Sequence, residues 1–121
     1  MHGLHLTADL RGCDSSLPVM TDTAALRARC VSAVVDAGLA PVGELFHRFG
    51  DGGLGITGVV LLAESHLAVH TWPELGAVTL DVYVCNFGAD NSTRAERLLA
   101  ALEAAFAPAS VERHRLQRGS A

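Results

Sequence analysis

A segment near the middle of the chain, LLAESHLAVHTWPE at residues 61–74, combines groups that could carry out covalent chemistry. It places Glu64, Ser65 and His66 between two apolar stretches, and His70 follows four residues later. A serine hydroxyl becomes a useful nucleophile when a neighbouring base, such as an imidazole, accepts its proton. This segment is therefore the first candidate for an active site.

Two common uses of these side chains do not suit the pattern. His66 and His70 lie on an expected strand, where four residues at ~3.3 Å each separate them by roughly 13 Å, so they cannot share one zinc ion. Ser65 lacks the G-x-S-x-G sequence of the serine-hydrolase nucleophile elbow. Taken alone, Ser65 could equally be a hydrogen-bonded serine at the end of a strand. We expect no metal site.

Composition excludes other classes of function. The nine basic residues are all arginine, which rules out a lysine-linked pyridoxal phosphate, a lysine nucleophile and a P-loop. A net charge of −4 without a basic patch argues against nucleic-acid binding. Three cysteines (Cys13, Cys30 and Cys85) without C-x-x-C spacing argue against a disulfide framework. No basic leader, signal core or membrane span stands out, so we expect a cytoplasmic protein.

The elements that position these residues should form one domain, residues 1–121. Helical patterns follow Thr21-Asp22 and a capping box that begins at Thr93. Short turns between most strands favour an α+β two-layer sandwich, an antiparallel sheet with two helices on one face. Because the strands look so apolar, we expect a homodimer to cover the other face. The strand patterns span residues 2–10, 40–49, 56–63, 66–71, 76–85 and 110–116.

The whole chain resembles the small prokaryotic S-adenosylmethionine decarboxylase proenzymes. The likeness runs from HLTADLRGCD through FHRF, ESHLAVHTWPE and LDVYVC to the C-terminal RG. In that family the proenzyme cuts itself at the Glu-Ser bond, and the serine becomes a covalently bound pyruvoyl group. The resemblance implies a β chain of residues 1–64, an α chain of residues 65–121, and a pyruvoyl cofactor derived from Ser65. It implies neither pyridoxal phosphate nor metal.

The family's self-processing chemistry assigns a role to each residue of the motif. The Ser65 hydroxyl would attack the carbonyl carbon of Glu64 and convert the peptide bond to an ester. A base then removes the α-proton of Ser65, which expels Glu64 as a carboxylate and leaves dehydroalanine, hydrolysed to pyruvoyl and ammonia. His70 matches the family's processing histidine, and an imidazole suits a base near neutral pH. Thr57 stands where the family usually has a serine that assists the ester step.

The same resemblance assigns residues to the decarboxylation. The pyruvoyl keto group would condense with the substrate's amino group and take up the electrons released as carbon dioxide leaves. Cys85 aligns with the family's proton-donating cysteine, although a cysteine at a strand end is otherwise a small core residue. Phe49 corresponds to a position that stacks on adenine. Glu74 matches the acid that binds the ribose hydroxyls, although by itself it could be a surface turn residue.

Other interpretations of the sequence stay open. The loop between Phe49 and Thr57 is longer than the family leads us to expect, and Asn86-Phe87 intervene before Gly88. A pyruvoyl-dependent arginine or ornithine decarboxylase, a processed but inactive partner subunit, and a non-catalytic dimeric α/β binding module are the alternatives. Phe49 and Glu74 favour a nucleoside. We therefore expect an S-adenosylmethionine decarboxylase that supplies aminopropyl groups for spermidine synthesis.

Overall fold

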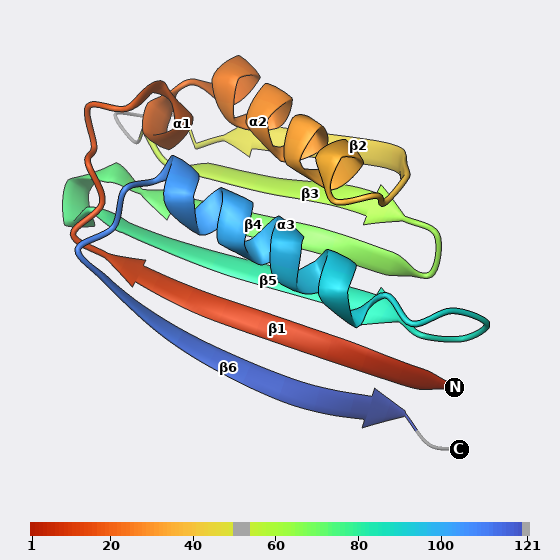
Figure 1. Ribbon diagram of the computed structural model, residues 1–121. Helices are drawn as coiled ribbons and strands as arrows, with labels where there is room; N and C mark the ends of the chain where they lie inside the picture. Colours follow the sequence, from red (N-terminus) through yellow and green to blue (C-terminus); the bar gives the residue numbers. More distant parts are fainter. Residues whose placement is uncertain (50–53, 120–121) are drawn as a thin grey trace.

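The computed structural model describes residues 1–49 and 54–119, which fold into an antiparallel sheet with helices on one face (Figure 1). The strands lie in the order β2-β3-β4-β5-β1-β6, and each neighbouring pair is antiparallel. This α+β two-layer sandwich confirms the fold class predicted from the sequence. The strands are β1 (His2–Arg11), β2 (Pro41–Arg48), β3 (Ile56–Leu62), β4 (Ser65–Trp72), β5 (Ala77–Cys85) and β6 (Ser110–Gly119).

Two long helices cover one face of this sheet, α2 (Thr23–Asp36) and α3 (Ser92–Ala105). Alternate side chains of the central strands point toward them, and burying each leucine there contributes roughly 1.5–3 kcal/mol. This core holds the strand register, since a slip of one residue would turn every apolar side chain away from the helices. The largest fully buried side chains include Leu4, Leu10, Leu67, Leu80, Leu98, Leu102 and Phe106.

The two long helices begin differently. The carboxylate of Asp22 accepts the N–H groups of Ala24 and Ala25 at 2.9 and 3.2 Å, which confirms the predicted start of α2. For α3 the predicted capping box is wrong, because the helix begins before Thr93 and its N-cap residue is Asn91. The Asn91 side chain accepts no helix N–H group. Two short elements, α1 (Pro18–Thr21) and the 3₁₀ turn η1 (Pro73–Leu75), were not predicted.

The uncovered face of the sheet carries most of the polar side chains. Cross-strand partners share a face, so the register defines rows of side chains across the sheet. One row contains His47, Thr57, His70, Thr79, Asp9 and Glu112. A second contains Leu61, His66, Tyr83, His5 and Leu116. We expected an apolar face here, and it is mixed instead, because strict alternation sends the apolar residues of these strands to the helix side.

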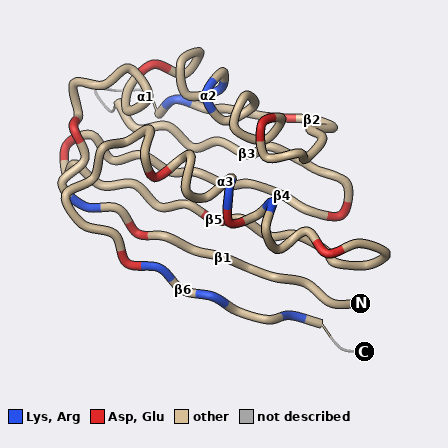
Figure 2. The backbone as a smooth tube through the Cα atoms, viewed as in Figure 1, with Lys and Arg blue, Asp and Glu red and all other residues tan. Residues whose placement is uncertain are grey.

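Charged residues gather along the edge strand β6, whereas the central strands carry few (Figure 2). Arg113 forms two hydrogen bonds of 2.6 and 2.7 Å with the buried carboxylate of Glu103 on α3. Arg115 contacts Glu96 on the same helix at 2.6 Å. These ion pairs attach the edge strand β6, which buries little apolar surface, to α3. No helix in residues 1–49 or 54–119 is long and apolar enough to cross a membrane.

Candidate active site

The Glu64-Ser65 peptide bond lies in the tight turn between β3 and β4. Leu62 pairs with Ser65, so Ala63 and Glu64 alone form the hairpin loop. Glu64 is exposed and has φ 54°, in the left-handed region that costs a residue with a side chain roughly 1–2 kcal/mol. The polar triplet therefore spans the turn and the start of β4. The predicted cleavage point immediately follows a strained residue.

Ser65 and Cys85 meet at this end of the sheet. The backbone N–H of Cys85, at the end of β5, donates a hydrogen bond of 3.1 Å to the Oγ of Ser65. The Cys85 residue is only 8% exposed, so its thiol lies largely out of water. A cavity of about 520 Å³ adjoins Ser65, and its lining includes Glu64, His66 and Tyr83. The predicted nucleophile and the predicted proton donor thus lie together.

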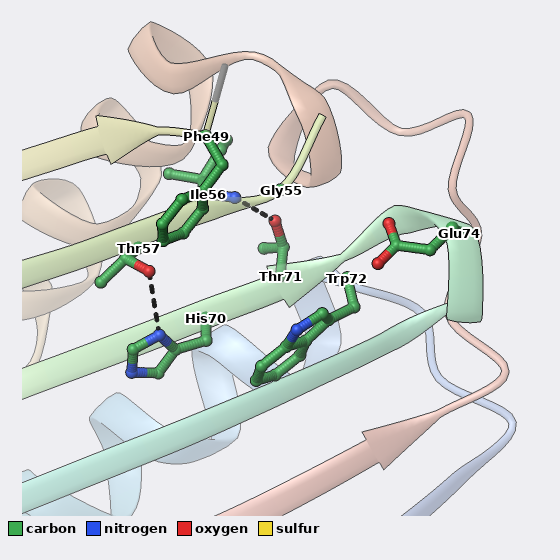
Figure 3. Close-up of a pocket in the computed structure, with 8 residues that line it drawn as sticks. All are labelled: Phe49, Gly55, Ile56, Thr57, His70, Thr71, Trp72 and Glu74. Atoms are coloured by element: carbon green, nitrogen blue, oxygen red, sulfur yellow. Dashed lines mark hydrogen bonds between the residues drawn. The ribbon is translucent and has the colours of Figure 1, made fainter. Parts of the chain in front are cut away.

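A second group of predicted site residues surrounds another cavity, of about 580 Å³ (Figure 3). Thr57 on β3 and His70 on β4 are paired across the strands, and the Thr57 Oγ1 and His70 Nδ1 atoms form a hydrogen bond of 3.1 Å. Phe49 follows β2 and leaves about half of its surface exposed, 52%. Glu74 sits in η1 at the end of the cavity. The aromatic ring, the imidazole and the carboxylate therefore face one space.

Trp72 belongs to this cavity too, although the sequence analysis did not assign it. Its ring stacks on His70 with centroids 5.8 Å apart and an interplanar angle of 27°. Between them in sequence, the buried Thr71 accepts the N–H of Ile56 and donates to the carbonyl of Met20, at 3.0 and 2.9 Å. The sequence held a signal for Trp72, because strand residues two apart share a face.

The two groups lie at opposite ends of β4. Figure 1 shows the β3–β4 turn at one end of the sheet and η1 at the other. Five residues at ~3.3 Å each place the Cα atoms of Ser65 and His70 roughly 16 Å apart. Within one chain His70 therefore cannot reach the α-proton of Ser65. Nor can Phe49 and Glu74 hold a substrate against residue 65.

The other two cysteines are unsuited to this chemistry. Cys30 is fully buried on α2, where burial raises its pKa to about 12, and Cys13 bonds through its N–H to the Gly76 carbonyl at the η1 end of the sheet, so neither thiol lies at the Ser65 end. All three cysteines are free. In residues 1–49 and 54–119, no cluster of three or more His, Cys, Asp or Glu residues is arranged to hold a metal ion.

Residue 65 suits a pyruvoyl group made from its own serine. It follows a surface turn, where the two new chain ends have room to separate, and it borders an open cavity. The predicted glycine-dense loop at 50–55 lies mostly outside the described residues, since residues 50–53 are not among them. Its described end is anchored by the Phe49 N–H, which donates to the Gly55 carbonyl at 3.0 Å.

Comparison with known proteins agrees with the sequence motifs. The profile of the S-adenosylmethionine decarboxylase family matches residues 4–119. The S-adenosylmethionine decarboxylase proenzyme of Picrophilus torridus is 35% identical over 118 residues, which cover 98% of this chain and 85% of that protein. The proenzyme of Archaeoglobus fulgidus is 33% identical over 117 residues, 97% of each chain.

A solved structure extends the likeness to three dimensions. The crystal structure of the adenosylmethionine decarboxylase from Aquifex aeolicus VF5 matches with a TM-score of 0.86 at 34% identity, covering 98% of this chain and 92% of that one. Fold and sequence together define a carboxy-lyase of the pyruvoyl-dependent class. The chain belongs to the S-adenosylmethionine decarboxylase family.

Proposed function

We propose that this protein is a self-processing S-adenosylmethionine decarboxylase, which forms the aminopropyl donor for spermidine synthesis. One observation carries the proposal. In a chain of this family, the Glu64-Ser65 bond lies in a strained hairpin turn, with Cys85 hydrogen-bonded to the serine oxygen. The free cysteines are compatible with the cytoplasmic location expected from the sequence.

Self-cleavage begins at the hairpin. The Ser65 Oγ attacks the carbonyl carbon of Glu64, the C–N bond breaks, and an ester links the two residues. The left-handed conformation of Glu64 favours cleavage as a whole, because the strain can relax once the chain is cut after residue 64. A base then takes the α-proton of Ser65, and Glu64 leaves with the ester oxygen as a carboxylate. His70, hydrogen-bonded to Thr57, is the base we assign.

Decarboxylation uses the same end of the sheet. The pyruvoyl group supplies a carbonyl that binds the substrate's amino group and accepts the electron pair left by carbon dioxide. Cys85 donates a proton to the substrate carbon, since its backbone already contacts residue 65 and its side chain is shielded from water. Shielding limits competition from solvent protons.

A homodimer joins the two ends of the site. When a second copy packs on the uncovered face with its strands reversed, two-fold symmetry places the Ser65 end of each chain over the His70 end of its partner. Two complete sites form from residues that one chain keeps roughly 16 Å apart. We therefore propose a homodimer of cleaved protomers in which His70 and Thr57 act on the partner's residue 65.

The cavity at the His70 end favours a nucleoside substrate over a free basic amino acid. Phe49 and Trp72 offer flat rings that can stack on an adenine base, and both line the cavity. The Glu74 carboxylate can accept hydrogen bonds from a ribose diol at the end of the same cavity. Arginine or ornithine would use the acid but would leave the stacking surfaces unfilled.

Two measurements test this function together. Mass spectrometry of the purified protein should find two chains that divide between residues 64 and 65, the second with a blocked N-terminus. Carbon dioxide release from labelled S-adenosylmethionine, arginine and ornithine, assayed side by side, should occur with S-adenosylmethionine. A single intact chain would exclude the cofactor, and turnover of arginine or ornithine alone would exclude the nucleoside substrate.

A further inference from the structure

Both backbone polar groups of Cys85 are held by side chains at the reacting end of the sheet. Its N–H donates to the Oγ of Ser65 at 3.1 Å. Its carbonyl oxygen accepts a hydrogen bond of 2.9 Å from the Nδ2 of Asn91. The backbone of Cys85 is thus held on both sides of its Cα, the Val84-Cys85 peptide by the predicted nucleophile and the Cys85-Asn86 peptide by Asn91, a residue to which the sequence motifs gave no role.

Asn91 occupies an unusual position for this task. It is the N-cap residue of α3, where an asparagine ordinarily accepts N–H groups of the first helical turn, yet its side chain accepts none of them. The Nδ2 group donates to Cys85, and the Oδ1 accepts from Arg94 at 2.8 Å. Asp90 instead accepts the N–H of Ser92 at 2.9 Å. Because Asp90 accepts this N–H group at the start of α3, the side chain of Asn91 can bond to the carbonyl of Cys85 instead.

Asn86 shapes the loop that presents Asn91. Its Oδ1 accepts the backbone N–H of Asn91 at 2.8 Å, and its own N–H donates to the carbonyl of His2 at 2.7 Å. Its Nδ2 donates to the Oγ of Ser92 at 3.2 Å. This loop contains Asn86-Phe87, the place where the sequence departs from the pattern we expect for the family. The inserted residues therefore lie in the same loop as the hydrogen bonds that hold Asn91 against Cys85.

We propose that Asn91 is a positioning residue for self-cleavage, acting on Ser65 through the backbone of Cys85. The inference rests on the proposed function, because it concerns the attack of Ser65 on Glu64. A serine hydroxyl on a short side chain rotates freely unless a partner fixes it. The N–H of Cys85 is such a partner, and Asn91 fixes the next peptide along the chain, on the other side of the Cys85 Cα, which limits rotation of the backbone at residue 85.

Geometry of this kind has large kinetic consequences. Reaction requires atoms aligned at roughly 3–3.5 Å, and a misplacement of about 1 Å can cost on the order of 10²-fold in rate. If the Cys85 carbonyl loses its donor, the backbone at residue 85 can rotate about its Cα and carry the N–H of Cys85 away from the serine oxygen. The same rotation shifts the thiol of Cys85, so decarboxylation should suffer as well.

Asn91→Asp removes the donor with little change in shape. Aspartate is an equally good N-cap residue and still accepts from Arg94, but its carboxylate repels the Cys85 carbonyl. Asn86→Asp is the matched control. It makes the same chemical change in the same loop, keeps the acceptor for the Asn91 N–H, and can accept from the Ser92 hydroxyl.

The test follows the loss of the intact 121-residue chain after synthesis, by gel and mass spectrometry, together with the melting temperature of each variant. We expect Asn91→Asp to cut itself at least about tenfold more slowly at an unchanged melting temperature. Asn86→Asp should cut within about twofold of the wild-type rate. In the cleaved fraction of Asn91→Asp, kcat should fall with KM unchanged.

Three outcomes have separate meanings. Equal cleavage rates for Asn91→Asp and wild type would overturn the assignment of Asn91 while leaving the proposed function intact. Equal slowing of both variants, or slowing that matches a loss of folded protein, would also overturn it, because the loop would then have only a structural role. A wild-type chain that never cuts itself would contradict the proposed function as well.

Discussion

The two ends of β4 differ in the structural features that surround them. At the Ser65 end, a strained turn and backbone hydrogen bonds hold small groups at one peptide bond. At the His70 end, larger side chains surround an open cavity, and Phe49, Trp72 and Glu74 are among them. One end carries the bond that we expect to be cut, and the other carries both the base we assign to the cleavage and the groups suited to recognise a substrate. Changes to the substrate-contacting side chains should therefore produce defects that are separable from defects in self-cleavage.

The largest effect should come from the Ser65 end. Ser65→Ala removes both the nucleophile and the future cofactor, so the protein should stay a single uncut chain without decarboxylase activity. The intact mass and a gel measure this directly. Ser16→Ala is a control, because Ser16 is exposed and bonds only to Asp14 among the side chains. If the Ser65→Ala chain were still cut, the cofactor would not come from Ser65.

Cys85→Ala should separate the two reactions that share the Ser65 end. Self-cleavage should continue at least in part, since the backbone N–H of residue 85 survives the change. Decarboxylation should fall by the ~10²–10⁴-fold typical of losing a positioned proton donor. Single-turnover assays on the cleaved protein measure the drop, and Cys13→Ala is the control thiol. If Cys85→Ala decarboxylated its substrate at the wild-type rate, Cys85 would not be the proton donor and would have only a packing role.

A change at the other end should affect the substrate alone. Glu74→Gln loses a charged acceptor worth roughly 1.5–3 kcal/mol, so kcat/KM for S-adenosylmethionine should drop about ten- to a hundredfold while self-cleavage stays normal. Glu96→Gln on α3 serves as a control away from the cavity. Decarboxylated S-adenosylmethionine should inhibit the wild type. If it fails to do so at millimolar levels while arginine or ornithine is turned over, the nucleoside interpretation is wrong.

The smallest effect concerns the strain at Glu64. In a Ser65→Ala background, which keeps the chain whole, Glu64→Gly should raise the free energy of unfolding by roughly 0.5–1 kcal/mol. Glycine adopts the left-handed conformation without penalty, and this gain exceeds the added freedom of the unfolded chain. Urea unfolding measures the difference. A lower stability would show that Glu64 is not strained.

The sequence predicted the sheet more successfully than the arrangement of the predicted site residues on it. Alternating apolar residues placed Ser65, His70 and Cys85 on strands or at their ends, because burial fixes the period of a strand. The same spacing argument that separated His66 from His70 applies to Ser65 and His70. Its consequence, a site divided between the two ends of β4, emerges only from the fold.

The sequence pattern was a poorer guide where a side chain bonds to a residue on another element. Thr93 with Glu96 fits a capping box, but Asp90 already satisfies the helix start and Asn91 reaches Cys85. A hydrogen bond between residues on different elements produces no periodic pattern of residue types in the sequence. The four-residue helix α1 is likewise too short to produce a helical pattern. Such contacts depend on tertiary packing and cannot be predicted from local spacing.

We propose above that Ser65 of one chain reacts with the help of His70 from another. Co-expression of Ser65→Ala and His70→Ala chains with different tags tests it most directly. Neither variant should cut itself alone, but in a mixed dimer one site regains both Ser65 and His70. The His70→Ala chain should then be cut between residues 64 and 65, while the Ser65→Ala chain should stay whole. If the His70→Ala chain remains uncut in purified mixed dimers, or is cut at the wild-type rate by itself, the shared site is contradicted.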